Sequence, residues 1–436
     1  MVAAPTAVSL FSSAGIGDLG LVANGIDVIA SSELVEERHR LYRANFPSTH
    51  CFTGDVRTHK DYLIDHVRRR LAGEELFLVL ATPPCQGMST NGAGKLLAEI
   101  RAGNRPPADE RNRLIIPTMD VATALRPKWL VLENVPAMKD TVIVGPSGKP
   151  VNLLDFVRQQ MGSDYVGGSE VVSCSDYGVP QVRKRLITIF TRDAGGADYF
   201  RRNQSFFPPS GKTKPVTLRQ AIGYLPALDP CTGPLACTEF HPLHYVQRMS
   251  VEKHWWIKNT PEGETAFNNQ CVAPHCGYAG NAAHVDRTAT DRAASPESSA
   301  LFCGECGSLL PRPSIVDPLT GQRRLIKGFH SAYRRMRWDE PARTLTRNFP
   351  FEASDNKIHP DQHRPLSIYE AMVLQTISDY HFGFDLNGKL AGRKVIADII
   401  GESVPPRLID VITRQILALP AQGTLTSRNG NDALAA

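Results

Sequence analysis

Short apolar segments alternate with helical patterns over about the first 190 residues of this chain. Six segments have the length and apolar character of buried strands: 7–11, 27–34, 76–82, 129–133, 169–174 and 186–191. Helical patterns lie between them, as at 62–72 and 114–125. Strands that alternate with helices build βαβ units, so we predict an α/β fold with a mainly parallel sheet covered by helices on both faces.

The alternation is lost between 194 and 342, where Pro, Gly, Ser and Thr become frequent and helical periodicity is weak. Amphipathic patterns return at 366–381 and 404–419. The residues after Pro420 are small and polar, so we expect a disordered tail at 420–436. Because 436 residues exceed one ordinary domain of about 100–200 residues, we also predict a second, smaller and more irregular domain.

The composition excludes several classes of protein. Hydrophobic residues make up 42% and charged residues 21%, which are values of a soluble globular chain rather than of a disordered or fibrous one. No apolar stretch approaches the ~20 residues of a membrane helix, and the N-terminus lacks the pattern of a secretory signal, so we expect no membrane partner. A net charge of +5 permits an anionic partner without requiring one.

The first predicted strand runs into a turn of small residues, SSAGIG at 12–17, before a helical pattern. Backbone N–H groups in such a turn can approach a ligand closely, and an acidic residue at the end of the next strand can bind ribose hydroxyls. Glu33 stands at that place, 16 residues after Gly17. A tight connection without any ligand explains these residues equally well, so both interpretations stay open at this point.

Two chemically reactive side chains follow later strands. Cys85, in ATPPCQGMST at 81–90, comes after a strand and two prolines, which would present its thiol at the carboxyl edge of the sheet. A thiolate there can attack an electrophilic carbon, whereas a buried structural cysteine is the alternative. Glu133, in VLENVPAM at 131–138, would reach the same edge and offers a general acid; its alternative role is a strand-end cap.

Basic residues gather in two places. Arg183, Lys184 and Arg185 in QVRKR precede the last predicted strand, and the forked guanidinium of arginine suits phosphates and base edges. A longer segment at 321–338 holds six Lys and Arg, no acidic residue and three aromatic residues. Cations at this density suit salt-dependent phosphate contacts. In both places an ordinary solvated basic surface is the alternative.

Four of the nine cysteines form two close pairs, Cys271-x4-Cys276 and Cys303-x2-Cys306. Four thiolates brought together make the tetrahedral ligand set of a structural zinc ion, and we predict such a module at about 271–306. A metal there would stabilise a loop-rich segment whose own core is small. His275 and His284 lie nearby as substitute ligands, and four reduced cysteines without a metal are the alternative.

Taken together, the motifs resemble those of the DNA cytosine-5 methyltransferases. They occur in that family's order: LFSSAGIGDLGL (10–21), YRANFP (42–47), GDV (54–56), PPCQG (83–87), ENV (133–135), PQVRKR (180–185), ARTLT (342–346), LSIYEAMVLQ (366–375) and GESVPPRL (401–408). The resemblance covers most of the chain outside about 194–330. It implies a Rossmann-like sheet of the S-adenosylmethionine-dependent type, with a catalytic domain at 1–193, a target recognition domain at 194–342 and a segment at 343–419 that returns to the catalytic domain.

The resemblance also implies a role for each motif. Cys85 would add to C6 of a flipped-out cytosine in a specific double-stranded DNA sequence, so that C5 takes the methyl group of S-adenosylmethionine. Glu133 would contact N3 and N4 of the base, and Arg183 would hold the base and nearby backbone. Residues that would bind the cofactor are Phe11, Ser12, Ala14, Gly15, Ile16, Glu33, Leu34, Asp55, Val56, Pro83, Ser403 and Val404. Residues that we expect to contact DNA are Gln86, Ser89, Arg185, Arg323, Arg324, Arg334, Arg335 and Arg337.

Three residues depart from the family's pattern: Ser9 stands where Asp is usual, Ser13 where Gly is usual and Glu402 where Asn is usual. None of them is a predicted catalytic residue, so we still expect an active enzyme. An RNA (tRNA) cytosine-5 methyltransferase and a catalytically silent DNA-binding homologue are the alternatives. We further expect a monomer in the cytoplasm of a prokaryote or of a phage-infected cell, associated with the nucleoid, with a cognate restriction endonuclease acting separately.

Overall fold

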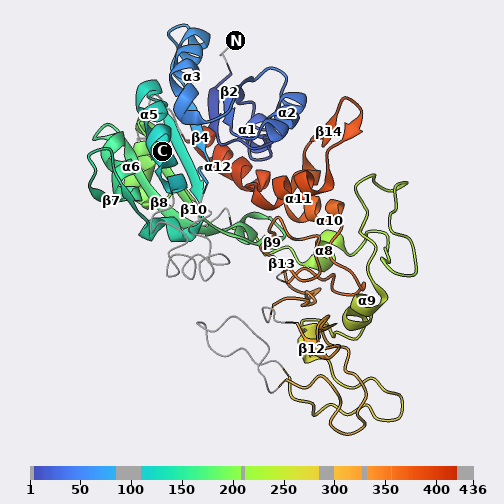
Figure 1. Cartoon of the computed structure of the whole chain (residues 1–436). Coiled ribbons are helices and arrows are strands. Elements are labelled where there is room, and N and C mark those ends of the chain that lie inside the picture. The colour runs from blue at the N-terminus through green and yellow to red at the C-terminus, as the bar shows by residue number, and fades with distance from the viewer. Residues whose placement is uncertain are drawn as a thin grey trace, which may run out of the picture. The chain divides into compact units, whose positions relative to one another are not determined.

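The computed structural model describes residues 4–84, 110–207, 212–283, 299–326, 331–354 and 356–419. Within these ranges the chain divides into two compact units (Figure 1). The first comprises Met1–Val172, Lys184–Gly211 and Leu408–Ala436, and the second comprises Ser173–Arg183 and Lys212–Arg407. The expected tail at 420–436 lies outside the described residues. In the part of the chain that is described, no helix has the length and apolar character needed to cross a membrane.

A seven-stranded sheet in the order β3-β2-β1-β4-β5-β10-β8 forms the centre of the first unit. Its strands are β1 (Thr6–Leu10), β2 (Asp27–Glu33), β3 (His50–Thr53), β4 (Leu78–Ala81), β5 (Trp129–Asn134), β8 (Val166–Ser173) and β10 (Lys184–Thr191). The pairs from β3 through β5 are parallel, whereas β10 runs antiparallel to β5. The predicted α/β fold with a mainly parallel sheet is therefore confirmed, and β3 is an additional strand.

One face of the sheet is covered by α3 (Val56–Leu71), α5 (Ile115–Leu125) and α6 (Leu153–Met161), as Figure 1 shows. These helices share one hydrophobic core with the strands, because each turns a stripe of apolar side chains toward the sheet. Helix α3 begins at a cap, where the side chain of Asp55 accepts a hydrogen bond from the backbone N–H of Arg57. The end of β3 and the start of α3 are thus joined by a fixed turn.

On the other face lie α1 (Leu19–Val22), α2 (Glu36–Asn45) and the last helix, α12 (Pro406–Ala418), which belongs to the first unit from its third residue onward. Asn24, just after α1, donates from Nδ2 to Asp410 Oδ1 on α12 at 2.8 Å. The last turns of the chain's final described helix are in this way fixed to the beginning of the sheet. Three further elements complete the unit: β6 (Val142–Val144), β7 (Pro150–Asn152) and α7 (Ala194–Asn203).

The second unit consists of shorter elements joined by long loops. Its helices are α8 (Leu218–Ile222), α9 (Val251–Lys258), α10 (Ile368–Leu374) and α11 (Arg393–Glu402). Its strands form three small pairs: β9 (Gln181–Val182) with β13 (Ala342–Arg343), β11 (Ser314–Val316) with β12 (Arg323–Leu325), and β14 (Asp385–Leu386) with β15 (Lys389–Leu390). Residues 343–407 pack within this unit. The functional boundaries expected at 193, 342 and 419 stay a prediction.

A buried ion pair stabilises the middle of the second unit. Arg364 donates to both carboxylate oxygens of Glu370, at 2.8 and 2.7 Å, and both side chains are fully buried. Glu370 also takes part in a capping box with Ser367 at the start of α10. Because a buried charge is tolerated when it is paired and hydrogen-bonded, this arrangement fixes α10 in place.

Candidate active site and recognition region

The segment that leads to Cys85 is held between two neighbouring strands. Thr82 donates from its backbone N–H to Leu10 O at 3.2 Å and from its hydroxyl to Phe11 O at 3.0 Å. Asn134 donates from Nδ2 to Pro83 O at 3.0 Å. These bonds fix the carboxyl end of β4 beside the ends of β1 and β5. Cys85, Gln86 and Ser89 themselves lie outside the described residues.

At the end of β5, the structure pairs Glu133 with an arginine. Arg185 donates from Nε to Glu133 Oε1 at 2.6 Å, and their side chains are 12% and 9% exposed. The antiparallel register, in which Ile187 lies opposite Glu133, brings the beginning of β10 to this position. A charge-assisted bond with little water around it is strong and holds both groups in one geometry. A fixed carboxylate and a guanidinium therefore lie together at the end of β5.

Arg183 has a different environment from the one implied by the resemblance. Its guanidinium is 2% exposed and donates to three carbonyl oxygens of the second unit: Leu345 O at 2.8 Å, Gly401 O at 3.2 Å and Ser403 O at 3.0 Å. The side chain thus joins the motifs ARTLT and GESVPP to QVRKR. This explains its burial without any contact to a base, and the expected base contact of Arg183 stays a prediction.

The turn after β1 has an unusual backbone. Phe11, Ser13 and Gly15 have φ angles of +59°, +49° and +87°, in the left-handed region. That region explains why the family usually has Gly where this chain has Ser13. A Cβ atom on Gly15 would lie 2.3 Å from the ring of Phe46, so the turn needs glycine there for space as well. The carboxylate of Glu33 accepts the N–H of Ser13 at 2.9 Å and keeps the turn against β2.

A buried carboxylate that the sequence did not indicate lies behind this turn. Asp18 accepts hydrogen bonds from Ser9 Oγ and from Tyr42 OH, both at 2.8 Å, and so ties the turn to β1 and α2. Burial raises the pKa of Asp18 from 3.8 to about 6, although both hydrogen bonds lower it. The sequence feature related to Asp18 is the departure at Ser9, although it did not identify Asp18 by itself. Where the family usually has an acid in β1, this chain has a hydroxyl group that donates to the carboxylate of Asp18, nine residues later.

The other residues predicted to bind the cofactor are divided between the units. Ala14, Ile16 and Val56 are buried in the first unit, and Leu34 is 67% exposed. The hydrogen bond from Arg57 lowers the pKa of Asp55, which also caps α3. Ser12 is half-buried, with its hydroxyl 3.4 Å from Ser32 O. Ser403 and Val404 are buried in the second unit.

The third departure from the family's pattern, Glu402, has a cationic neighbour. Arg347 NH1 lies 3.9 Å from Glu402 Oε1, so the extra negative charge is balanced within the second unit. The preceding residue, Gly401, has no room for a side chain, because a Cβ atom there would lie 2.2 Å from the backbone nitrogen of Arg347. The glycine of GESVPP is therefore required by packing.

The two cysteine pairs meet in the second unit. The sulfur atoms of Cys271, Cys276, Cys303 and Cys306 all lie within 4.8 Å of one another, a group that could hold a metal ion. The Sγ–Sγ distances are 3.7 Å for Cys271–Cys306 and 3.8 Å for Cys276–Cys303. Gly277 and Gly307 have positive φ angles in the turns after each pair. His275 does not belong to this group, and His284 lies outside the described residues.

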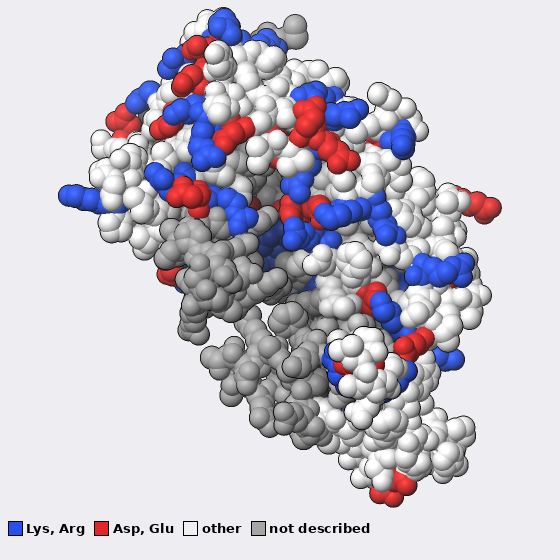
Figure 2. All heavy atoms as spheres, viewed as in Figure 1, with Lys and Arg blue, Asp and Glu red and all other residues white. Residues whose placement is uncertain are grey.

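The basic segment at 321–338 meets acidic side chains from other parts of the second unit. Arg323 forms an ion pair with Glu252, Arg324 approaches Asp317 at 3.5 Å, and Arg337 approaches Glu340 at 3.8 Å. Arg334 donates to Gly263 O at 2.7 Å. On the face in view, Figure 2 likewise shows basic and acidic side chains interspersed. The charge of the segment is thus smaller than its sequence suggests.

Arg335 lies buried in the second unit, and its expected contact with DNA stays a prediction. It is 3% exposed and donates to the carbonyl oxygens of Thr260, Ile257, His359 and Gln362 at 2.7–2.9 Å. A guanidinium that is buried and surrounded by carbonyl groups holds loops together and presents no charge to a phosphate.

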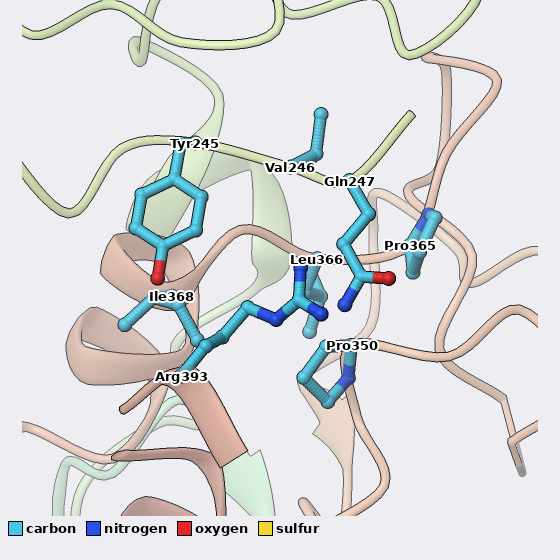
Figure 3. A pocket seen from close by; sticks show the side chains of 8 residues that line it. All are labelled: Tyr245, Val246, Gln247, Pro350, Pro365, Leu366, Ile368 and Arg393. Atoms are coloured by element: carbon cyan, nitrogen blue, oxygen red, sulfur yellow. The ribbon is translucent and has the colours of Figure 1, made fainter. Parts of the chain in front are cut away.

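A small hollow opens elsewhere in the second unit (Figure 3). Tyr245, Gln247 and Arg393 line it together with prolines and aliphatic side chains, and Figure 3 shows Arg393 and Gln247 pointing toward each other. Leu366 and Ile368 of the motif LSIYEAMVLQ line it, but none of the predicted catalytic, cofactor-binding, DNA-binding or metal-binding residues does. The hollow is therefore not the candidate active site.

The sheet, its glycine turn, the acid at the end of β2 and the carboxylate at the end of β5 define an α/β enzyme of the Rossmann-like type. Comparison with known proteins identifies the family. Residues 6–418 match the C-5 cytosine-specific DNA methylases. The chain therefore belongs to this family: it is a DNA cytosine-5-methyltransferase that uses S-adenosylmethionine.

Bacterial relatives match along nearly the whole chain. The Type II methyltransferase M1.HgaI of Avibacterium volantium is 29% identical over 419 residues, covering 94% of this chain and 97% of that protein. The Type II methyltransferase M1.HphI of Haemophilus parahaemolyticus is 26% identical over 414 residues, covering 95% and 87%.

Solved structures show the same fold. A prophage-encoded protein (E. coli), assigned as a DNA modification methyltransferase, superimposes with a TM-score of 0.56 at 17% identity, covering 95% of this chain and 99% of that one. DNMT2 of Spodoptera frugiperda superimposes with a TM-score of 0.53 at 11% identity, with the same coverage. The predicted Rossmann-like fold is confirmed.

Proposed function

We propose that this methyltransferase modifies a flipped-out cytosine in a specific double-stranded DNA sequence through a covalent bond between Cys85 Sγ and C6 of the base. A thiolate cannot reach C6 inside a stacked duplex, so the base must leave the helix, at a cost of a few kcal/mol. Addition to C6 makes C5 nucleophilic, so that C5 would take the methyl group that S-adenosylmethionine supplies, with S-adenosylhomocysteine as the leaving group. Loss of the C5 proton with elimination of the Cys85 thiolate would then restore the ring. The observation that carries this proposal is the buried Glu133–Arg185 pair beside the anchored segment that leads to Cys85.

Glu133 and Arg185 would act on the base as a unit. The carboxylate oxygens of Glu133 would meet the N3 and N4 edge of the cytosine while Arg185 holds the carboxylate in place. Arg185, rather than being a contact to the DNA backbone, would then be part of the base pocket. For Arg183 we keep the proposal that it holds the base and nearby backbone; in the structure its guanidinium bonds three carbonyl oxygens of the second unit.

The turn at 11–16 and Glu33 would hold S-adenosylmethionine, which supplies the methyl group when it is bound. Glu33 uses one lone pair on each oxygen for the N–H groups of Ser13 and Val35. A carboxylate has about four acceptor sites, so capacity remains for ribose hydroxyls. Gly15 lets the backbone approach the ligand, and the exposed side chain of Leu34 offers an apolar contact. We also propose that Asp55, Val56, Ser403 and Val404 contact the cofactor.

The second unit would carry target recognition. Of the basic residues there, Arg323, Arg324 and Arg337 keep proposed roles as phosphate contacts, because exchange of an acidic neighbour for a phosphate costs little at a partly exposed ion pair. We propose the same role for Arg334, which is half-buried and bonds the carbonyl oxygen of Gly263. The four cysteines would hold a structural zinc ion, since four thiolates within 4.8 Å suit its tetrahedral preference.

The relatives named as Type II methyltransferases support a place in a restriction–modification system. We propose that the chain acts as a monomer in the cytoplasm of a prokaryote or of a phage-infected cell, close to the nucleoid. A separate endonuclease that cuts the unmodified sequence would be its partner in function.

Transfer of a tritiated methyl group tests the proposal. Purified protein with labelled S-adenosylmethionine should label unmethylated duplex DNA and leave tRNA unlabelled. Arg185→Gln should lower the rate on DNA about 100-fold or more, because the base would lose a fixed carboxylate. Equal labelling by wild type and Cys85→Ser would contradict the covalent mechanism, and labelling of tRNA instead of DNA would favour the RNA alternative.

A further inference from the structure

We propose that the ion held by the four cysteines controls DNA binding by the second unit and leaves cofactor binding unchanged. The inference rests on the proposed function, because it assigns DNA recognition to the second unit. The inference is based on a series of contacts that connects the cysteine sulfur atoms, through Arg312, Asn269 and Trp256, to the basic segment at 321–338.

The cysteines themselves form the core of the segment that they lie in. The buried residues of this small core are Cys271, Cys303 and Leu310, with Cys276 and Cys306 packed against them. Among the described residues of this core, Leu310 has the one large aliphatic side chain. A segment that buries so little apolar surface needs another source of stability, and metal binding by thiolates supplies one.

Hydrogen-bond donors lie around the sulfur atom of Cys303 and would stabilise its thiolate form, which is the form that binds a cation. Asn281 Nδ2 lies 3.8 Å from Cys303 Sγ, and its Oδ1 accepts the backbone N–H of Gly304 at 2.9 Å. Backbone N–H groups of Glu305 and Cys306 also donate to the sulfur of Cys303. Donors to metal-bound thiolates are the usual surroundings of a structural metal site.

Arg312 connects the two cysteine pairs to each other and to the rest of the unit. Its fully buried guanidinium donates from NH1 to Ala282 O and Ala300 O, each at 2.6 Å, and from Nε to Asn269 O at 2.7 Å. Ala282 follows the first pair and Ala300 precedes the second. Arg312 therefore bonds carbonyl groups beside both pairs at once, so separation of the pairs on loss of the ion would break these bonds.

Asn269 and α9 carry the connection further. Asn269 Nδ2 donates to Trp256 O at 2.8 Å and to Pro311 O at 2.6 Å, which fixes the segment to the end of α9. Trp256 packs edge-on against Tyr333 at 5.8 Å in a shared core. Arg334 follows Tyr333 directly in the chain, and Arg337 lies three residues beyond Arg334. Loss of the ion would therefore weaken the packing that holds Arg334 and Arg337, the residues proposed to contact phosphates, in position.

The cofactor turn depends on none of these contacts. It is held by Ser9, Asp18, Glu33 and Tyr42, all within the first unit. The proposed cofactor contacts of the second unit, Ser403 and Val404, take no part in the described contacts that run from the cysteines to Tyr333; Ser403 bonds Arg183 and Gln375 instead. Loss of the ion should accordingly leave the affinity for S-adenosylmethionine or its product unchanged.

The test compares Cys306→Ser with Cys237→Ser in the full chain. Cys237 lies in the same unit and is half-buried, but it does not belong to the metal group, so it controls for loss of a thiol. Three quantities are measured: zinc per chain by inductively coupled plasma mass spectrometry, affinity for S-adenosylhomocysteine by isothermal titration calorimetry, and affinity for a fluorescently labelled DNA duplex by fluorescence anisotropy. The duplex is drawn from unmethylated DNA that the wild type modifies.

We expect about one zinc per chain in the wild type and in Cys237→Ser, and much less in Cys306→Ser. The DNA dissociation constant of Cys306→Ser should rise at least about tenfold, with that for S-adenosylhomocysteine changed less than about twofold. In the wild type, removal of the ion with a chelator should weaken DNA binding in the same way, and added Zn²⁺ should restore it.

Three results would overturn the inference: wild type without bound metal, a zinc-free chain that binds DNA normally, or an equal loss of S-adenosylhomocysteine affinity. Failure of the wild type to bind or modify duplex DNA would instead contradict the proposed function itself. The chelation experiment keeps the test decisive when the cysteine variant does not fold.

Discussion

Replacement of Asp18 by Asn should change how the stability of the protein depends on pH. Burial raises the pKa of Asp18 to about 6, from 3.8 in the unfolded chain. The folded protein therefore holds a proton that the unfolded chain has lost, so the contribution of Asp18 is most favourable below pH 3.8 and is lost as the pH rises to about 6. A shift of about 2 pKa units corresponds to about 3 kcal/mol over the whole window, and roughly 1 kcal/mol of it falls between pH 5 and 7.

Urea unfolding of wild type and Asp18→Asn at half-unit pH intervals measures this difference. Asn has nearly the same shape as Asp and carries no charge. We therefore compare the free energy of unfolding of the wild type with that of Asp18→Asn: the difference, wild type minus variant, should fall by roughly 1 kcal/mol from pH 5 to 7 and then level off. Tyr42→Phe, which removes one donor to the carboxylate, should raise the pKa further and move the fall to higher pH. A difference that stays constant from pH 5 to 8 would refute the assignment of a raised pKa to Asp18.

Three other perturbations have defined outcomes. Gly15→Ala should weaken S-adenosylhomocysteine binding about tenfold or more in calorimetry, because its Cβ atom would meet the ring of Phe46. Gly25→Ala is the control, since Gly25 also has a positive φ of +72° but has open space around it; equal affinity of the two variants would show that the clash at Gly15 does not matter. Glu370→Gln leaves Arg364 buried without a counter-charge and should lower the free energy of unfolding by about 3–5 kcal/mol; less than about 1 kcal/mol would show that the pair is dispensable. Arg337→Gln should reduce the slope of log DNA affinity against log salt by about 1, and an unchanged slope would remove Arg337 from the phosphate contacts.

Much of the first unit was predictable because its signals are local. Apolar runs of strand length gave all six predicted strands within a few residues, as in the match of 129–133 to Trp129–Asn134. Strand β3 (His50–Thr53) escaped because its residues are at best half-buried and carry little apolar signal. Helix α3 begins at Val56, several residues before the predicted start at 62, because the cap at Asp55 has no apolar periodicity of its own.

The second unit followed its sequence less closely. The pattern at 366–381 is α-helical only over Ile368–Leu374; Thr376, with a left-handed backbone at φ +61°, ends the α-helix, and a short 3-10 helix follows at Ile377–Asp379. Helix α11 (Arg393–Glu402) was not predicted. The meeting of the cysteine pairs was foreseen from spacing alone, because short-range pairs leave few arrangements other than a common cluster.

The roles of the arginines depend on tertiary packing, which a linear motif does not contain. Arg183 and Arg185 are two residues apart and chemically identical, yet one is surrounded by carbonyl groups and the other pairs with Glu133. Likewise, Arg335 is buried although its neighbours Arg334 and Arg337 are not. The sequence identifies such arginines, and the structure shows which of them bond backbone carbonyl groups and which pair with an acidic side chain.

Bisulfite sequencing of plasmid DNA from cells that express this chain, beside cells that express Cys85→Ser, tests the central claim most directly. The account predicts cytosines protected from conversion within one recurring sequence in the wild type, and none in the variant. Such a result would establish the reaction, the substrate and the nucleophile together. Protected cytosines with Cys85→Ser at the wild-type level, or none with the wild-type chain, would contradict it.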